Sequence, residues 1–243
     1  MEYFRTLSDD DPVLAYSPLL RAAQLTLQYT VDQGAIPLTP SKAFKRVFVH
    51  WAAEHFDWPD MGYDELFSVN KVLNEYDFAP LELLHFLLIK LKLGRHYKGQ
   101  FKITKRGAEL LAHPQQLLME LVPYYMMNMD HSSYSRSGDQ AVGNWDVWLN
   151  VLNVETENGS TEIQLYKVFY GKLGDAPMAW RATSSFYCCV LRPLCWAGLL
   201  TAHQAQDDKR LEAAYFKTPL WPVWLTLDTD NMVEPAQRHW LLC

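Results

Sequence analysis

The sequence predicts a mostly helical protein with small β-hairpins, which places it in the α+β class. Apolar residues recur every three or four positions over 17–33 and over several later stretches, the spacing of a helix with one buried face. Three short apolar stretches each run into a threonine, at Thr39, Thr104 and Thr218. A threonine side chain accepts a hydrogen bond from a free N–H of a first helical turn, so each of these residues is expected to start a helix.

Four helices are expected before residue 93. In the first, over 17–33, Ser17 fits the N-cap, Pro18 fits the first helical position and Gly34 fits the stop. The second is expected from Thr39–Pro40 to about Phe56, the third over 63–75 after a turn at 58–62, and the fourth over 80–92.

A hairpin and a further helix follow the fourth helix. Lys98–Gly99 fits the hairpin turn, and Gly94 fits the C-cap of the helix over 80–92. Thr104 then fits the N-cap of the next helix.

The C-terminal third repeats this plan. A helical stretch ends in a glycine and two leucines, a polar hairpin is expected over 201–212, and Thr218–Pro219 opens the closing helix. This copy has two departures from the first. Pro193 is expected to interrupt the helix before the hairpin, and Trp221 stands where the first copy has Gly107.

The order helix, hairpin, helix resembles a winged helix-turn-helix unit. The first copy carries Ile103-Thr104-Lys105-Arg106-Gly107, which is similar to the Leu/Ile-Thr-x-x-Gly strand end of that family. The resemblance implies two winged-helix-like units, each with a recognition helix followed by a wing. The chain as a whole also resembles uncharacterised bacterial proteins related to plasmid open-reading-frame products, a resemblance that implies no activity.

A polar, serine-rich stretch divides the chain between the two copies. We therefore expect an N-terminal helical, winged-helix-like unit over 1–128, a linker or loop over 129–143 and a C-terminal winged-helix-like unit over 144–243.

Positive charge is concentrated around the first hairpin. The net charge of the chain is −6, yet residues 83–108 carry +7 and no acidic side chain, which leaves −13 for the remainder. Such a segment can neutralise phosphates, with Tyr97 and Phe101 placed to stack or to pack. The alternative is a solvated hairpin whose charge is balanced by acidic neighbours. The candidate nucleic-acid-binding residues are Lys90, Lys92, Arg95, Lys98, Lys102, Lys105 and Arg106.

The helix over 80–92 argues against base reading. Leucines and other apolar residues cover nearly every side of it, and a helix that is apolar all round is buried. A recognition helix in a DNA groove instead presents polar and basic side chains to base edges. Glu82, one of the few residues able to face outward, would repel phosphate.

No catalytic, cofactor or metal site is predicted. Cys188, Cys189, Cys195 and Cys243 lack the spacing of a zinc site and are expected to be buried free thiols. The eight histidines are scattered along the chain, and whether any of them meet in space is left open. The stretch 228–231 resembles the start of a calcium loop but lacks its later glycine and glutamate, so a turn is expected.

The C-terminus is rich in tryptophan. Trp221 and Trp224 are expected in the core, whereas Trp240, Leu241 and Leu242 form a candidate partner-binding segment, because an apolar end must dock on its own chain or on a partner.

A soluble, cytoplasmic protein is expected. The first eleven residues are acidic where a signal peptide would be basic and then apolar. No uncharged apolar run approaches the roughly 20 residues that span a bilayer.

Three function classes stay open. The first is a non-enzymatic interaction protein that uses winged-helix-like units for contact with a protein partner or for self-association, favoured by the net acidity and the many tryptophans. The second is a DNA-associated regulator that contacts phosphates through the wing over 90–106. The third is an enzyme whose site is assembled from distant residues.

Overall fold

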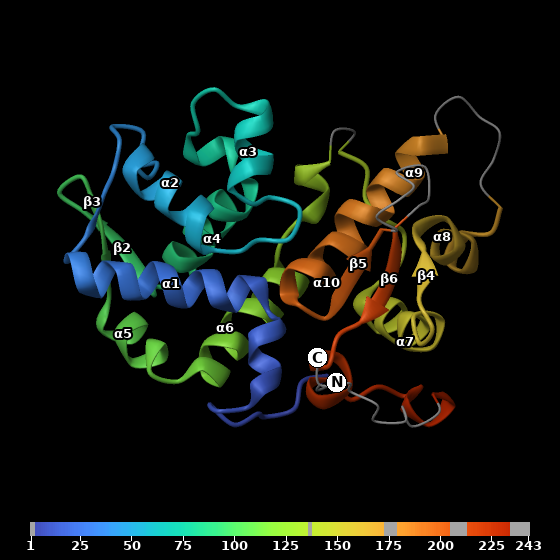
Figure 1. Ribbon diagram of the computed structural model, residues 1–243. Helices are drawn as coiled ribbons and strands as arrows, with labels where there is room; N and C mark the ends of the chain where they lie inside the picture. The colour runs from blue at the N-terminus through green and yellow to red at the C-terminus, as the bar shows by residue number, and fades with distance from the viewer. Residues whose placement is uncertain (1–2, 136–137, 173–178, 205–212, 234–243) are drawn as a thin grey trace. The chain divides into compact units, whose positions relative to one another are not determined.

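The computed structural model describes residues 3–135, 138–172, 179–204 and 213–233 (Figure 1). These residues fall into two compact units. The N-terminal unit holds residues 6–129 together with 196–198. The C-terminal unit holds the residues up to Arg5, those from Asp130 to Cys195 and those from Leu199 onward.

The N-terminal unit is helical with one small sheet. Strand β3 is the central strand, antiparallel to both β1 and β2, so the strand order is β1-β3-β2. Its α-helices are α1 (Pro18–Gln33), α2 (Arg46–His55), α3 (Tyr63–Val69), α4 (Ala79–Lys90), α5 (Lys105–Leu111) and α6 (Pro114–Asn128), its strands are β1 (Ile36–Pro37), β2 (Gly94–Tyr97) and β3 (Gln100–Ile103), and its 3-10 helices are η1 (Pro12–Tyr16) and η2 (Glu75–Asp77).

Helix α1 is the centre of this unit and has the bounds that its sequence predicts. The Ser17 hydroxyl accepts a hydrogen bond from the Leu20 N–H at 3.2 Å, and Gly34 ends the helix with a φ of 77°. The buried face of α1 packs against α4, α5, α6 and β3 (Figure 1). Burial of this apolar face is the main source of the unit's stability.

Thr39 does not start a helix, contrary to the prediction. Its N–H donates to the Ala43 carbonyl at 2.8 Å, and its hydroxyl accepts from the Ala43 N–H at 3.1 Å. These bonds close a loop in which Lys42 takes the left-handed conformation, with a φ of 69°. Helix α2 therefore begins only at Arg46. The third helix is also shorter than predicted, since α3 ends at Val69.

The first hairpin forms as predicted. Lys98 and Gly99 both have positive φ, at 49° and 72°, as a two-residue type I′ turn requires. Gly94 does not cap α4, contrary to the prediction, because the chain leaves that helix at Lys92 with a φ of 58°. Gly94 belongs to β2, where a Cβ atom would lie only 2.0 Å from the Phe101 ring.

Thr104 caps α5, as predicted. Its hydroxyl accepts from the Gly107 N–H at 3.0 Å and donates to the Lys92 carbonyl at 2.7 Å. Gly107 lies against the same connection, since a Cβ atom there would be 2.1 Å from the Leu93 carbonyl oxygen. The Thr-x-x-Gly sequence thus fixes α5 tightly to the chain that leaves α4.

The C-terminal unit repeats the order of elements. Strand β6 lies between β4 and β5, so the strand order β4-β6-β5 matches that of the first sheet. Its elements are η3 (His131–Tyr134), α7 (Trp145–Glu155), β4 (Ser160–Thr161), α8 (Glu162–Tyr170), α9 (Ala179–Phe186), the π-helix η4 (Tyr187–Leu191), α10 (Arg192–Ala197), β5 (Leu200–His203), β6 (Ala214–Lys217), α11 (Leu220–Trp224) and η5 (Asp230–Met232). The last two residues of α10 are grouped with the N-terminal unit.

Pro193 does not interrupt the helix before the second hairpin, contrary to the prediction. The Arg192 N–H donates to the Tyr187 carbonyl, the i to i−5 bond of a π-helix, and the chain continues into α10 through Pro193. A helix follows Thr218, as predicted: its hydroxyl accepts from the Leu220 N–H at 3.2 Å. Most of the polar hairpin predicted over 201–212 lies outside the described residues.

The fold class is thus confirmed as mostly helical with small antiparallel sheets. Part of the polar stretch over 129–143 is ordered as η3, where the Asp130 carboxylate accepts from the Ser132 N–H at 3.1 Å. Among the described residues, no helix has the length and apolar character needed to cross a bilayer.

Candidate functional site

The outer face of the first hairpin gathers three cations around one exposed tyrosine. Side chains alternate between the two faces of a strand, so Arg95 and Tyr97 share a face, and Lys102 lies opposite Arg95 in the register. Arg95, Lys98 and Lys102 lie 5.5, 5.3 and 5.9 Å from the centre of the Tyr97 ring, within cation–π range. Tyr97 is 46% exposed. We call these four residues the Tyr97 cluster.

The ion pairs recorded for the basic segment lie outside the Tyr97 cluster. Within the described part of the chain, Arg95, Lys98 and Lys102 form no ion pair, whereas Lys105 and Arg106 pair with Glu109 and Glu120 at 3.8 and 2.6 Å. Each of the two interpretations of the basic segment, a phosphate-binding surface and a charge-balanced hairpin, therefore applies to a different part of it. Neighbouring carboxylates balance its C-terminal part, and the hairpin itself keeps its charge.

Helix α4 does not present a base-reading surface. Seven of its twelve residues are buried, as its sequence predicts. The side chains left exposed are Glu82, Phe86 and Lys90. The remaining basic candidate, Lys92, lies in the connection from α4 to β2.

The inner face of the hairpin carries a hydrogen-bonded chain of three titratable residues. The His85 Nδ1–H donates to Glu75 Oε1 at 2.6 Å, which leaves His85 Nε2 as the acceptor for His96 Nε2–H at 2.8 Å. The second carboxylate oxygen of Glu75 accepts from the Phe44 N–H. The Phe44 ring also stacks on His85, with ring centres 3.9 Å apart. We call Glu75, His85 and His96 the Glu–His–His chain.

Sequence reasoning missed this chain because its members come from three separate elements. Glu75 lies in η2, His85 in α4 and His96 in β2, and no motif spacing joins them. Glu75 and His85 are buried, whereas His96 is exposed on the strand. Partial burial lowers the pKa of His96, and the nearby His85 and Lys42 lower it further, while Glu75 acts in the opposite direction.

Two neighbouring hollows lie on this inner side. The first, of about 460 Å³, is bounded by the α4 side chains Glu82, Phe86 and Ile89 together with His96, and we call it the α4 hollow. The second, of about 570 Å³, lies at the start of α2, and we call it the α2 hollow. Both hollows share Ser41, Ala43, Glu75 and Tyr76.

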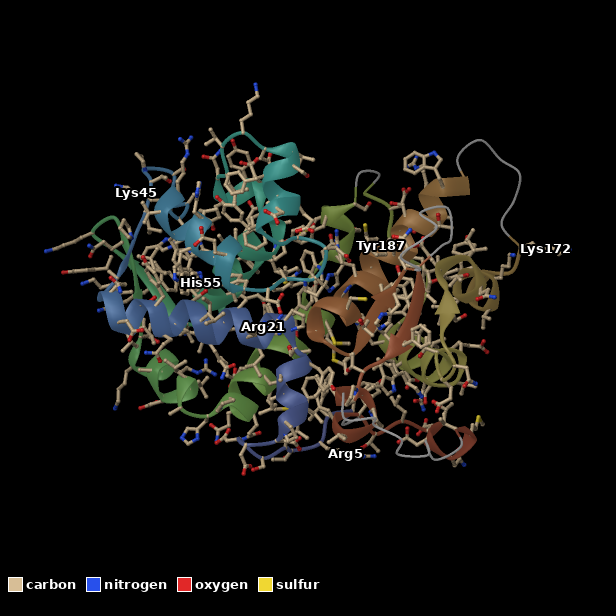
Figure 2. All side chains as sticks on the ribbon, viewed as in Figure 1. Arg5, Arg21, Lys45, His55, Lys172 and Tyr187 are labelled. Atoms are coloured by element: carbon tan, nitrogen blue, oxygen red, sulfur yellow. The ribbon has the colours of Figure 1, made fainter. Side chains whose placement is uncertain are left out.

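Three cations border these hollows. Lys42 lines the α4 hollow, and Lys45 and Arg46 line the α2 hollow. Lys45, labelled in Figure 2, directly precedes α2. In the described structure, these three side chains form no ion pair; the Arg46 Nε–H donates to Asn74 Oδ1 at 2.9 Å.

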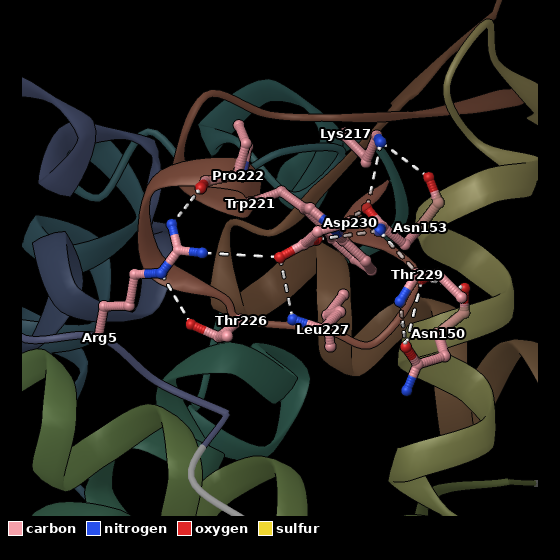
Figure 3. A network of polar contacts seen from close by, with 10 residues as sticks. All are labelled: Arg5, Asn150, Asn153, Lys217, Trp221, Pro222, Thr226, Leu227, Thr229 and Asp230. Carbon is pink, nitrogen blue, oxygen red and sulfur yellow. Dashed lines mark hydrogen bonds and ion pairs between the residues drawn. The ribbon is translucent and has the colours of Figure 1, made fainter. Parts of the chain in front are cut away.

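The C-terminal unit holds a polar network centred on Asn153 (Figure 3). The Asn153 amide donates to Thr229 and Asp230, each at 3.1 Å, and its oxygen accepts from the Trp221 indole N–H at 2.9 Å. Asp230 also accepts from the Leu227 N–H at 3.1 Å, and the turn predicted over 228–231 is formed by residues 228 and 229 and continues into η5. Each of these groups has a protein partner, so this network stabilises the fold.

The predictions for the tryptophans, the cysteines and a metal site can be compared directly with the structure. Trp221 and Trp224 are buried in the core, as predicted, while Trp240, Leu241 and Leu242 lie outside the described residues. Cys188 and Cys189 are buried thiols outside any disulfide, as predicted, and burial raises the pKa of Cys189. Cys195 is also a thiol outside any disulfide, but it is only partly buried, contrary to the prediction, and Cys243 lies outside the described residues. Across the described ranges, no group of three His, Cys, Asp or Glu side chains is arranged to hold a metal ion.

Comparison with known proteins places both units in described domain families. Residues 15–116 match the Y4jL N-terminal domain, and residues 135–219 match the y4jL C-terminal domain. The chain is 40% identical over 168 residues to "Uncharacterized protein y4jL" of Sinorhizobium fredii (strain NBRC 101917 / NGR234), which covers 68% of this chain and 75% of that protein. No solved structure matches the chain.

Proposed function

The chain belongs to the y4jL family, and we propose that it is a non-enzymatic interaction protein whose two units act as winged-helix-like modules. In this proposal the N-terminal unit binds the backbone of a nucleic acid through the Tyr97 cluster. Its role is that of a DNA-associated factor that does not read bases.

The repeated topology supports the winged-helix interpretation. In each unit a helix, a short strand and further helices precede a hairpin, and the short strand pairs with the second strand of that hairpin. In this interpretation the hairpin is the wing, which in the N-terminal unit is β2–β3. The C-terminal hairpin uses a basic side chain inside the unit, because the Lys217 Nζ donates to the Asn153 carbonyl at 2.7 Å.

The observation that carries the nucleic-acid proposal is that the three cations of the Tyr97 cluster form no ion pair with any described residue. Three cations held around an exposed aromatic ring suit a phosphate chain, since the cations neutralise phosphates and the ring offers a stacking surface for a base. Base-specific recognition is not part of the proposal, because α4 is largely buried and exposes Glu82.

Fluorescence anisotropy of labelled random-sequence DNA, duplex and single-stranded, at several salt concentrations tests this proposal. We expect salt-dependent binding, and we expect the triple variant R95E/K98E/K102E to abolish it. The log–log salt slope of the wild type should include about −0.9 for each neutralised duplex phosphate. The matched control is K105E, because Lys105 is exposed and lies beside Glu109. Equal binding by the wild type and the triple variant would refute the role of the cluster.

Contact with another protein is the second candidate function, and the two hollows favour it. Phe86, Tyr76 and Val47 are 47%, 69% and 77% exposed, and all three line a hollow. Large apolar side chains gathered at a hollow are typical of a protein-binding surface. Sedimentation velocity of the wild type and of F86S separates self-association from binding to a different protein.

A further inference from the structure

We infer that the α4 hollow and the α2 hollow together bind an extended acidic peptide that carries aromatic or large aliphatic side chains. This inference rests on the second candidate function, contact with another protein, and names the chemistry of the partner. It is independent of nucleic-acid binding by the Tyr97 cluster, which lies on the outer face of the hairpin.

The apolar part of the partner is inferred from α4. Phe86 and Ile89 lie on one face of that helix, three residues apart, and both line the α4 hollow. Phe86 is 47% exposed, so an apolar side chain placed in the hollow would remove a large aromatic surface from water. Tyr76, shared by both hollows, continues this surface toward α2.

The acidic part of the partner is inferred from charge complementarity. Lys42, Lys45 and Arg46 border the hollows and have no ion-pair partner among the residues that the structure describes. The Glu75 carboxylate does not neutralise them, because it is buried and bonded to His85 and to the Phe44 N–H. Acidic side chains of a partner would therefore lie against residues 42–46.

Glu82 sets the orientation of the partner. It is the exposed carboxylate on the α4 wall, so it repels acidic side chains from that wall and leaves it to apolar ones. The same charge disfavours a nucleic acid in this hollow, since protein surfaces that bind phosphates are strongly basic. A peptide satisfies both walls, because it can alternate acidic and apolar side chains on its two sides.

The Glu–His–His chain makes this surface rigid before binding. It ties η2, α4 and β2 together behind the hollows, and Phe44 stacks on His85 from the 39–45 loop. A preformed surface loses less conformational entropy on binding, which favours affinity.

Binding of a fluorescently labelled random copolymer of glutamate and tyrosine tests the inference, with labelled polyglutamate and heparin of similar length as comparison probes. We expect the copolymer to bind more tightly than polyglutamate. F86S should weaken copolymer binding about tenfold, as expected when a central aromatic contact is lost. E82Q should strengthen binding, a gain that a merely structural role of Glu82 does not produce. V168S, in α8 of the other unit, is the matched control, because Val168 is 48% exposed.

The outcomes separate this inference from both proposed functions. The variant R95E/K98E/K102E should keep copolymer binding while losing DNA binding. Equal affinity for copolymer and polyglutamate, or no effect of F86S with unchanged circular dichroism, would overturn the inference. Preferential binding of heparin by R95E/K98E/K102E, which lacks the cations of the Tyr97 cluster, would assign the hollows to polyanions in general and would overturn the inference. Concentration-dependent dimerisation that F86S abolishes would keep the protein-contact function and make a second copy the occupant, which also overturns the acidic-peptide inference.

Discussion

At the residue scale, the Glu–His–His chain shows how buried polar groups are satisfied in this protein. A buried carboxylate without partners would be costly, and Glu75 instead accepts from the Phe44 N–H and from His85. His85 in turn accepts from His96, so each buried member has its hydrogen bonds inside the unit. The exposed end of the chain is His96, whose pKa is lowered by partial burial.

Replacement of His96 is expected to change how stability depends on pH. Three groups face its ring: Glu75 from η2, His85 from α4 and Lys42 from the 39–45 loop. Because the folded-state pKa of His96 lies below the ordinary histidine value of 6.5, the folded protein prefers the neutral ring. This contribution to stability is complete above the unfolded-state pKa and is lost as the pH falls through it toward the folded-state pKa.

Urea unfolding of the wild type and of H96Q measures this effect. We expect the stability advantage of the wild type to shrink between about pH 7.5 and about pH 5. H55Q is the comparison, because His55 lies at the exposed end of α2 and bonds the Trp51 carbonyl. A difference between wild type and H96Q that is constant with pH would contradict the prediction.

At the scale of elements, local signals predicted most of what formed. The bounds of α1 followed from Ser17 and Gly34, and the first hairpin followed from Lys98–Gly99, because each of these signals acts within a few residues. The concentration of basic residues on the hairpin was also predictable, since these residues lie close together in the sequence. Their division into balanced and unbalanced charges was not, because it depends on distant carboxylates such as Glu120.

The predictions that failed were overruled by contacts outside the local sequence. Thr39 has the sequence of a cap, but the 39–45 loop is held by Phe44, whose N–H donates to Glu75, 31 residues away. Pro193 remains in a helix because the π-turn before it changes the hydrogen-bond register. The Glu–His–His chain could not be predicted either, because it forms only when three elements pack together.

Substitution of Gly107 by alanine is expected to destabilise the N-terminal unit by about 2 kcal/mol. The new Cβ atom would lie 2.1 Å from the Leu93 carbonyl oxygen, which already accepts from the Thr104 N–H at 3.0 Å. This clash outweighs the gain of about 1 kcal/mol in helix propensity. Urea unfolding followed by circular dichroism measures the change.

Gly99→Ala is the matched control for this substitution. Nothing lies within 4 Å of a Cβ atom at Gly99, so its expected cost of about 1 kcal/mol comes only from the left-handed backbone. A G107A protein as stable as the wild type would show that α5 can move away from the α4 exit without loss.

At the scale of the whole molecule, the two units are not consecutive in sequence. Residues 3–5 belong to the C-terminal unit, where the Arg5 N–H donates to the Trp224 carbonyl at 2.7 Å and the Thr226 N–H donates to the Tyr3 carbonyl at 2.8 Å. The Phe4 ring lies against Trp224, with centres 4.5 Å apart. The Arg5 guanidinium adds bonds to Thr226 and to Asp230 (Figure 3).

Phe4→Ala is therefore expected to destabilise the C-terminal unit, by about 2 kcal/mol for a half-buried aromatic side chain. Hydrogen exchange followed by mass spectrometry should show faster amide exchange in α11 and in the 225–230 segment. Val31→Ala, at a 50% exposed position of α1, should leave that exchange unchanged. Unchanged protection of α11 in F4A would contradict the role of the first residues.

The attachment of residues 3–5 to α11 also sets an order of events during synthesis. These residues leave the ribosome before their partners, which follow 221 residues later, a delay of about 10–45 s at ordinary translation rates. Throughout that interval the N-terminal unit can fold while the segment before it has nothing to pair with. Joining the two ends of the C-terminal unit is thus a late step of maturation, and a nascent chain stalled before residue 224 would keep Phe4 exposed to chaperones.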